Sequence, residues 1–136
     1  MKTLRSFTLF SVIAILSVFT LATTNSYAFD INIDVAPNVL NIQSKSVVVT
    51  VHTDVAYNLV LGSSVFLNDV AIDHWKADDR GNFVAKFSSD EVKNLDGLII
   101  DDYNTLVMTG YLTSGEAFIG TQDILVIDVL PKKGKK

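Results

Sequence analysis

The chain has 136 residues, of which 49% are hydrophobic, 15 are acidic and 11 are basic, and it contains no cysteine. The length suits one domain, and the apolar content is too high for a disordered chain. The lack of cysteine excludes disulfides, thiolate catalysis, cysteine-ligated zinc and a lipid anchor on an N-terminal cysteine.

The first 28 residues have the pattern of a secretory signal peptide. A basic start with Lys2 and Arg5 precedes an uncharged run over residues 6–24, and a short segment of mainly small residues ends at Ala28. This succession is typical of exported proteins. We therefore predict cleavage after Ala28, with Phe29 as the first residue of a secreted or periplasmic protein that does not insert into a membrane once the signal peptide is removed.

The charge distribution argues against nucleic acid as a partner. Loss of Lys2 and Arg5 leaves nine basic against 15 acidic residues, a net charge of −6. Four of the nine are lysines within residues 132–136, which we predict to be a disordered basic tail. The domain that remains, residues 29–131, has five basic residues and a net charge of −10, so it repels nucleic acid and anionic lipid.

Alternating apolar and polar residues predict strands along most of the mature chain. Alternation with a period of two marks a strand with one buried face, and branching at Cβ favours the pleated conformation. The pattern is clearest over residues 30–35, 46–54 and 82–87. Further strands are predicted over residues 39–42, 64–67, 70–75, 104–113 and 117–130.

The strand at 46–54 makes a definite prediction about the core. Val47, Val49 and Val51 alternate there with Thr50 and His52. Because successive side chains of a strand point to opposite faces, we expect the three valines to face the core and His52 to face solvent.

Two turns and a short helix connect the predicted strands. Residues 78–82 and 113–116 contain the glycines and short polar side chains of tight turns. Residues 88–95 predict one or two turns of helix, because serine can cap the N-terminus and acidic side chains occupy the first turn. The alternation of the last strand is disturbed at 120–123, where we expect a bulge or bend.

This succession of short strands and turns predicts an all-β fold. Seven or eight strands with a turn about every 8–12 residues are typical of a two-sheet antiparallel β-sandwich of immunoglobulin-like type. No repeat or linker divides the mature chain, so we expect one such domain after the cleaved signal peptide.

Several longer segments carry a resemblance to a known kind of protein. They include IDVAPNVLNIQSK at residues 33–45, SSVFLN at 63–68 and TGYLTSGEAFIGTQDILVI at 109–127, with VTV at 49–51 and FVAKF at 83–87 between them. In this order they resemble an uncharacterised β-sandwich module of secreted and cell-surface bacterial and archaeal proteins. The resemblance implies a β-sandwich within an exported protein, and it implies no activity, catalytic residue or ligand.

Many members of that module carry an acidic loop, similar to a calcium loop, before the strand that corresponds to residues 83–87. Here the segment is Asp78–Asn82, and Arg80 brings a positive charge to the position where a calcium ligand would be needed. Calcium binds six to eight oxygens, and this segment offers three suitable side chains. We predict a polar turn without a metal, with residual calcium binding as the alternative.

The candidate residues for chemistry form no convincing site. His52 and His74 are the only histidines, and their spacing matches no zinc pattern. Ser63 lacks the second glycine of a nucleophile elbow. The pairs Asp78–Asp79 and Asp101–Asp102 point to opposite faces of an extended chain, which suits glycoside hydrolysis poorly. We predict no enzyme activity, no cofactor and no metal.

Exposed aromatic rings are the remaining candidates for ligand binding. Aromatic side chains can stack on sugar rings, although most of them cover the ends of a core. We predict a secreted, non-enzymatic β-sandwich that acts as a structural or interaction module of the cell envelope or exterior, with a protein or a surface polysaccharide as its partner. The alternative is a carbohydrate-binding module that uses Tyr57, Trp75, Tyr103 and Tyr111.

Overall fold

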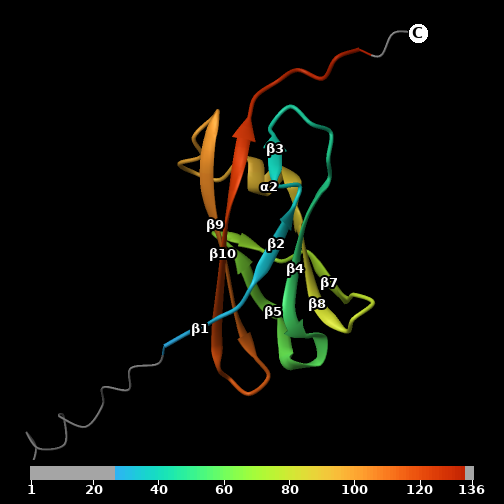
Figure 1. Ribbon diagram of the computed structural model, residues 1–136, viewed down its shortest axis with the longest axis vertical. Helices are drawn as coiled ribbons and strands as arrows, with labels where there is room; N and C mark the ends of the chain where they lie inside the picture. Colours follow the sequence, from blue (N-terminus) through green and yellow to red (C-terminus); the bar gives the residue numbers. More distant parts are fainter. Residues whose placement is uncertain (1–26, 134–136) are drawn as a thin grey trace, which may run out of the picture.

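The computed structural model describes residues 27–133 and consists mostly of β-strands arranged in two sheets (Figure 1). The predicted signal peptide up to residue 26 and the lysine tail beyond residue 133 lie outside the described residues. None of the described helices is long and apolar enough to cross a membrane.

The larger sheet has six strands in the order β1–β10–β9–β5–β6, with β3 also paired to β10. Its centre is the long antiparallel hairpin of β9 and β10, which Figure 1 shows in orange and red. The short strands β1 and β3 both run parallel to β10. The bounds are β1 Phe29–Asp30, β3 Val39–Asn41, β5 Val60–Leu67, β6 Val70–Ala71, β9 Asp102–Leu112 and β10 Ala117–Ile127.

The smaller sheet has four strands in the order β2–β4–β8–β7, and every neighbouring pair is antiparallel. A 3-10 helix, η1 (Tyr57–Leu59), carries the chain from β4 into β5 of the larger sheet. The bounds are β2 Ile33–Ala36, β4 Val48–Ala56, β7 His74–Ala77 and β8 Asn82–Ser88.

The two inner faces enclose one apolar core, as in a β-sandwich. Its largest fully buried side chains include Phe83, Phe87 and Phe118, the first two from the smaller sheet and the third from the larger. Each buried phenylalanine contributes about 1.5–3 kcal/mol relative to an exposed one. The predicted two-sheet, all-β architecture is therefore present.

Two of the predicted strands are each divided between the sheets. The segment 30–35 forms β1 on β10 and then β2 on β4, and the segment 70–75 forms β6 and the start of β7. The alternation continues through the first crossing because Ile31, Ile33 and Val35 all pack in the core between the sheets. A pattern of burial does not reveal where a chain changes sheets.

The predicted faces of β4 are confirmed in part. Val49 and Val51 are buried and His52 is exposed, as expected. The prediction for Val47 is wrong, because its side chain is 78% exposed. The ladder with β8 begins at Val48, so Val47 precedes the sheet and does not reach the core.

The predicted helix and turns are confirmed. The helix α2 spans Ser89–Lys93, and the Ser88 hydroxyl accepts a hydrogen bond from the backbone N–H of Glu91 at 3.4 Å. Such a cap satisfies one of the free N–H groups at a helix start. Gly81 and Gly115 occupy the two turns with φ values of 79° and 89°, which glycine adopts without strain.

The predicted bulge at 120–123 is wrong, because β10 pairs with β9 along its length without a register shift. Gly120 interrupts the apolar pattern for a packing reason: a Cβ atom there would lie 2.6 Å from Cγ2 of Ile33. Gln122 interrupts it for a polar reason, since its Oε1 accepts a hydrogen bond from the Val35 N–H at 2.7 Å. Both residues attach β2, on the opposite sheet, to β10.

Candidate functional site

The four aromatic candidates do not lie together. Trp75 on β7 pairs with the buried Ala85 and so points toward the inner side of its sheet. Its indole covers Gly62 of β5, where a Cβ atom would come within 2.2 Å of the ring. Trp75, 39% exposed, therefore closes one edge of the sandwich between the two sheets.

Tyr57 also supports the core. It lies in η1 at the end of β4, and its ring stacks on Phe83 with centroids 6.4 Å apart and an interplanar angle of 27°. Its backbone N–H donates to the carbonyl of Gly81 in the neighbouring turn. The ring thus packs over one end of the core.

Tyr103 and Tyr111 are the two candidates that share a face. Both lie on β9, which alternates between buried side chains and side chains that point away from the core. Eight residues separate them, or about 26 Å at about 3.3 Å per residue. They belong to the outer face of the six-stranded sheet.

This outer face, which we call the apolar face, exposes large hydrophobic side chains. Five of them are 41–66% exposed: Val39, Leu61, Phe66, Tyr103 and Tyr111. Half-buried apolar residues of β9 and β10 lie between them, namely Val107, Ile119 and Leu125. The remaining outward residues of the two central strands are three threonines, Ala117, Ile127 and one acidic residue, Asp123. No lysine or arginine points outward from this face among residues 27–133.

A register shift in β5 brings two of these residues beside β9. Leu61 pairs with Tyr111 and Phe66 pairs with Thr109. Four residues of β5 therefore lie between two pairing positions that only one residue separates on β9. Ser64 holds this irregularity: its hydroxyl accepts from the Tyr111 N–H at 2.9 Å and donates to the Leu61 carbonyl at 2.6 Å. The sequence pattern could not reveal the cluster, because Leu61 and Phe66 are out of phase for a regular strand.

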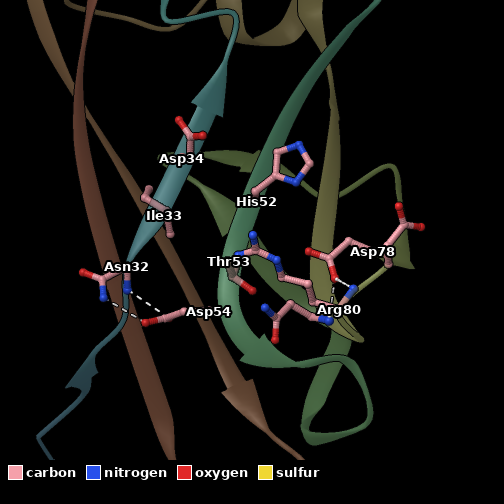
Figure 2. Close-up of a pocket in the computed structure, with 10 residues that line it drawn as sticks. Asn32, Ile33, Asp34, His52, Thr53, Asp54, Asp78 and Arg80 are labelled. Carbon is pink, nitrogen blue, oxygen red and sulfur yellow. Dashed lines mark hydrogen bonds between the residues drawn. The ribbon is translucent and has the colours of Figure 1, made fainter.

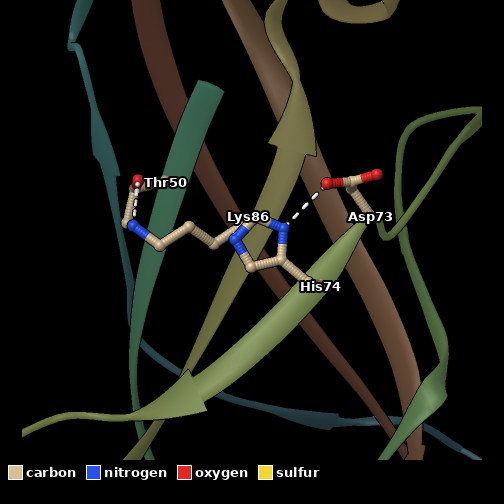
Figure 3. A network of polar contacts seen from close by, with 4 residues as sticks. All are labelled: Thr50, Asp73, His74 and Lys86. Carbon is tan, nitrogen blue, oxygen red and sulfur yellow. Dashed lines mark hydrogen bonds and ion pairs between the residues drawn. The ribbon is translucent and has the colours of Figure 1, made fainter. Parts of the chain in front are cut away.

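The outer face of the four-stranded sheet, which we call the charged face, differs from it. Register places Asp34 beside His52, and Lys86 between Thr50 and His74. The Lys86 ammonium donates to the Thr50 hydroxyl at 3.1 Å (Figure 3). His74 Nδ1 lies 2.7 Å from a carboxylate oxygen of its exposed neighbour Asp73.

A polar pocket of about 490 Å³ lies at one end of the charged face. Asp34, His52, Asp54 and Arg80 help to line it, and Figure 2 shows the Arg80 side chain extending toward β4. The Asp54 carboxylate already has hydrogen-bond partners within the chain. Its two oxygens accept hydrogen bonds from the backbone and side-chain nitrogens of Asn32 at 3.1 and 2.8 Å.

The turn Asp78–Asn82 borders the same pocket. One carboxylate oxygen of Asp78 accepts hydrogen bonds from the backbone N–H groups of Arg80 and Asn82, both at 2.9 Å. This arrangement fixes the turn between β7 and β8. No three histidine or acidic side chains converge to hold a metal ion in the part of the chain that the structure describes.

The other candidates for chemistry are separated from one another. Ser63 lies on β5, whereas His52 and His74 lie on the four-stranded sheet. Asp101 and Asp102 stand at the start of β9 in no described pocket. Ser63 therefore has neither histidine on its own sheet, and of the two acidic pairs only Asp78–Asp79 borders a pocket.

One structural polar residue, Asn104, is not among the residues that the sequence pattern singled out. Asn104, a buried residue of β9, binds the preceding loop through Nδ2, which donates to the carbonyls of Ile99 and Asp102 at 2.9 and 3.0 Å. Its Oδ1 accepts from the Ile99 N–H at 2.7 Å. The alternation of β9 places Asn104 on the buried face, and a polar residue on a buried face indicates a structural hydrogen-bonding role.

Comparison with known proteins finds no matching family model, no similar curated protein and no similar solved structure. The two outer faces and the pocket are therefore interpreted from their own chemistry.

Proposed function

We propose that the mature chain is an exported, non-catalytic β-sandwich of immunoglobulin-like type that acts as a structural or interaction module of the cell envelope or exterior. The apolar face carries this proposal. Contiguous exposed apolar patches beyond a few hundred Å² mark interaction surfaces on soluble proteins. The signal-peptide pattern of residues 1–28 and the resemblance to modules of exported proteins support the location.

The export part of the proposal is tested on the N-terminus. The full chain is expressed with a C-terminal tag in a bacterial host, and the exported fraction is analysed by mass spectrometry. The expected first residue is Phe29, because signal peptidase cleaves after small residues such as Ala28. An exported protein that still begins at Met1 would contradict it.

The interaction part is tested by capture from native envelope and medium. Leu61→Lys places a charge on the apolar face, and Val47→Lys makes the same kind of change at a residue that is 78% exposed outside it. We expect the first variant to lose a partner that wild type and the second variant retain. Equal capture by all three proteins would refute a role for this face.

Carbohydrate binding is the second candidate, because Tyr103 and Tyr111 lie on the same strand and face. Stacking of a ring on a sugar is lost when the ring is removed. Tyr111→Ala should then reduce retention on an insoluble polysaccharide at least about tenfold, roughly 1.4 kcal/mol. Tyr57→Ala, outside the face, should not. Equal retention of the two variants would exclude this use of the face.

A further inference from the structure

The apolar face has the size of a specific protein interface. β9 and β10 contain 11 residues each, which at about 3.3 Å per residue gives a length of about 36 Å. Four adjacent strand positions, from β1 and β3 to β5, add a width of about 19 Å at about 4.8 Å each. The resulting area of about 700 Å² is close to the share of one partner in a standard interface, about 800 Å².

The charges of the face indicate a neutral partner surface. Among residues 27–133 no cation points outward from it, whereas two carboxylates do. Asp30 lies on the edge strand β1 beside Ile119, and Asp123 already accepts a hydrogen bond from the Thr105 hydroxyl at 2.5 Å. The centre of the face, around Val107 and Ile119, carries no charge of its own, so it offers an acidic partner surface nothing to pair with and suits an uncharged one. The centre of the face is itself an uncharged surface of the required kind.

The register of β9 and β10 makes the face complementary to itself. The exposed ring of Tyr111 stands opposite Ala117, so a large side chain has a small one beside it. Thr105 stands opposite Asp123, which places a hydroxyl donor beside a carboxylate acceptor. In these two pairs a protruding or donating group on β9 has a receiving group at the same level on β10.

We infer that the apolar face packs against the same face of a second copy of this chain. The inference rests on the proposed function, since it names the partner of that interaction surface. A two-fold axis that lies in the interface, along the boundary between β9 and β10, places each β9 residue over its β10 partner in the other copy. Tyr111 then covers Ala117 of the second copy, and the hydrogen-bonded Thr105–Asp123 pair of one copy lies over the same pair of the other. Aligned sheets pack in this way about 10 Å apart.

Sedimentation equilibrium of the processed full chain tests the inference. Between about 1 and 200 μM, wild-type protein should pass from monomer to dimer, and Leu61→Lys should raise the dimer dissociation constant at least about tenfold. Val47→Lys should leave that constant unchanged. Circular dichroism melts of both variants check that the monomers are folded.

A second measurement uses the absence of cysteine from the chain. Val107, half-buried near the middle of β9, stands close to the inferred axis. Because sheets about 10 Å apart hold the two position-107 Cα atoms beyond disulfide reach, a short bismaleimide linker should join Val107→Cys into a covalent dimer. Thr50→Cys is the matched control, because Thr50 is also half-buried but lies on the charged face. It should stay monomeric.

Each result decides between the inference and its alternatives. A dimer that Leu61→Lys leaves intact, or equal cross-linking at positions 107 and 50, overturns the inference. A wild-type chain that is monomeric throughout also overturns it. In that case loss of envelope capture by Leu61→Lys would keep the proposed function with a different partner, whereas unchanged capture would remove both.

Discussion

The outer faces of the two sheets follow the same two-residue period and yet expose different chemistry. On the charged face, Val84 is fully buried although it faces outward between its cross-strand neighbours His52 and Lys76. On the apolar face, Tyr111 and Leu61 stand beside each other and remain about half exposed. Long polar side chains cover apolar surface and keep their charges in water, so only the apolar face is left without a cover.

The difference also concerns how firmly each face is held. The Ser64 hydroxyl accepts a hydrogen bond from the Tyr111 N–H of β9 and donates one to the Leu61 carbonyl of its own strand, so it fixes both residues. On the charged face, Lys86 and His74 contact their neighbours through exposed or half-buried side chains. A rigid apolar surface loses little conformational entropy on binding, which suits the apolar face for recognition and the charged face for contact with solvent.

The largest expected effect tests which side of the six-stranded sheet is inner. Met108→Ala removes a fully buried side chain of β9 and should lower the free energy of unfolding by about 2–5 kcal/mol. Thr109→Ala, at the next position on the apolar face, should cost less than about 1 kcal/mol, mostly through lost strand propensity. Urea unfolding of both variants measures the difference. Equal costs would mean that the apolar face is as buried as the core.

The corresponding test on the four-stranded sheet should give a smaller difference. Val49→Ala removes two buried methyl groups and should cost about 1–3 kcal/mol. Thr50→Ala should cost less than about 1 kcal/mol, although it also removes the acceptor of the Lys86 hydrogen bond. The same urea unfolding experiment applies, and a reversed order would invert the faces of β4 and bring His52 into the core.

The edge of the sandwich that Trp75 closes offers a third test, in which the expected loss of stability is smaller. Gly62→Ala puts a methyl group where the indole of Trp75 lies, and because that ring is partly exposed it can move aside. We expect a loss of about 1 kcal/mol, at the low end for overpacking. Trp75 is the only tryptophan, so its fluorescence should shift to the red. Ser63→Ala is the control, and a matching shift there would show that Gly62 is not the cause.

Much of the fold could be predicted because the two-residue period reports burial directly. Val49, Val51 and His52 lie on their predicted faces, and the helix begins at its predicted serine cap. Pairing partners are not local, so the pattern did not reveal that the first strand divides between two sheets. It also failed at Val47, where the strand start depends on the distant Ser88 that pairs with Val48.

The apolar face shows the same limit more sharply. Tyr103 and Tyr111 were recognisable as candidates, since each is an aromatic residue in an alternating strand. Leu61 and Phe66 were not, because the register shift in β5 puts them out of phase. Gly120 and Gln122 resembled a bulge, whereas they make room and a hydrogen bond for β2 across the sandwich. The surface exists only once several strands are assembled.

The smallest expected effect concerns the turn that borders the charged face. A chelator such as EDTA should leave the melting temperature of the processed chain unchanged. Asp78 already uses one carboxylate oxygen to accept two backbone N–H groups, and the Arg80 side chain brings a positive charge to the same pocket. Calcium would need six to eight oxygens there.

Thermal unfolding by circular dichroism, with and without the chelator and after re-addition of calcium, measures this effect. A decrease of more than about 4–8 °C, which corresponds to roughly 1 kcal/mol for a domain of this size, would show that the turn binds a metal. The charged face would then have a ligand of its own, because a cation held by Asp78 and Asp79 would attract anionic groups into the pocket beside Arg80. The contrast between a binding face and a solvated face would no longer hold.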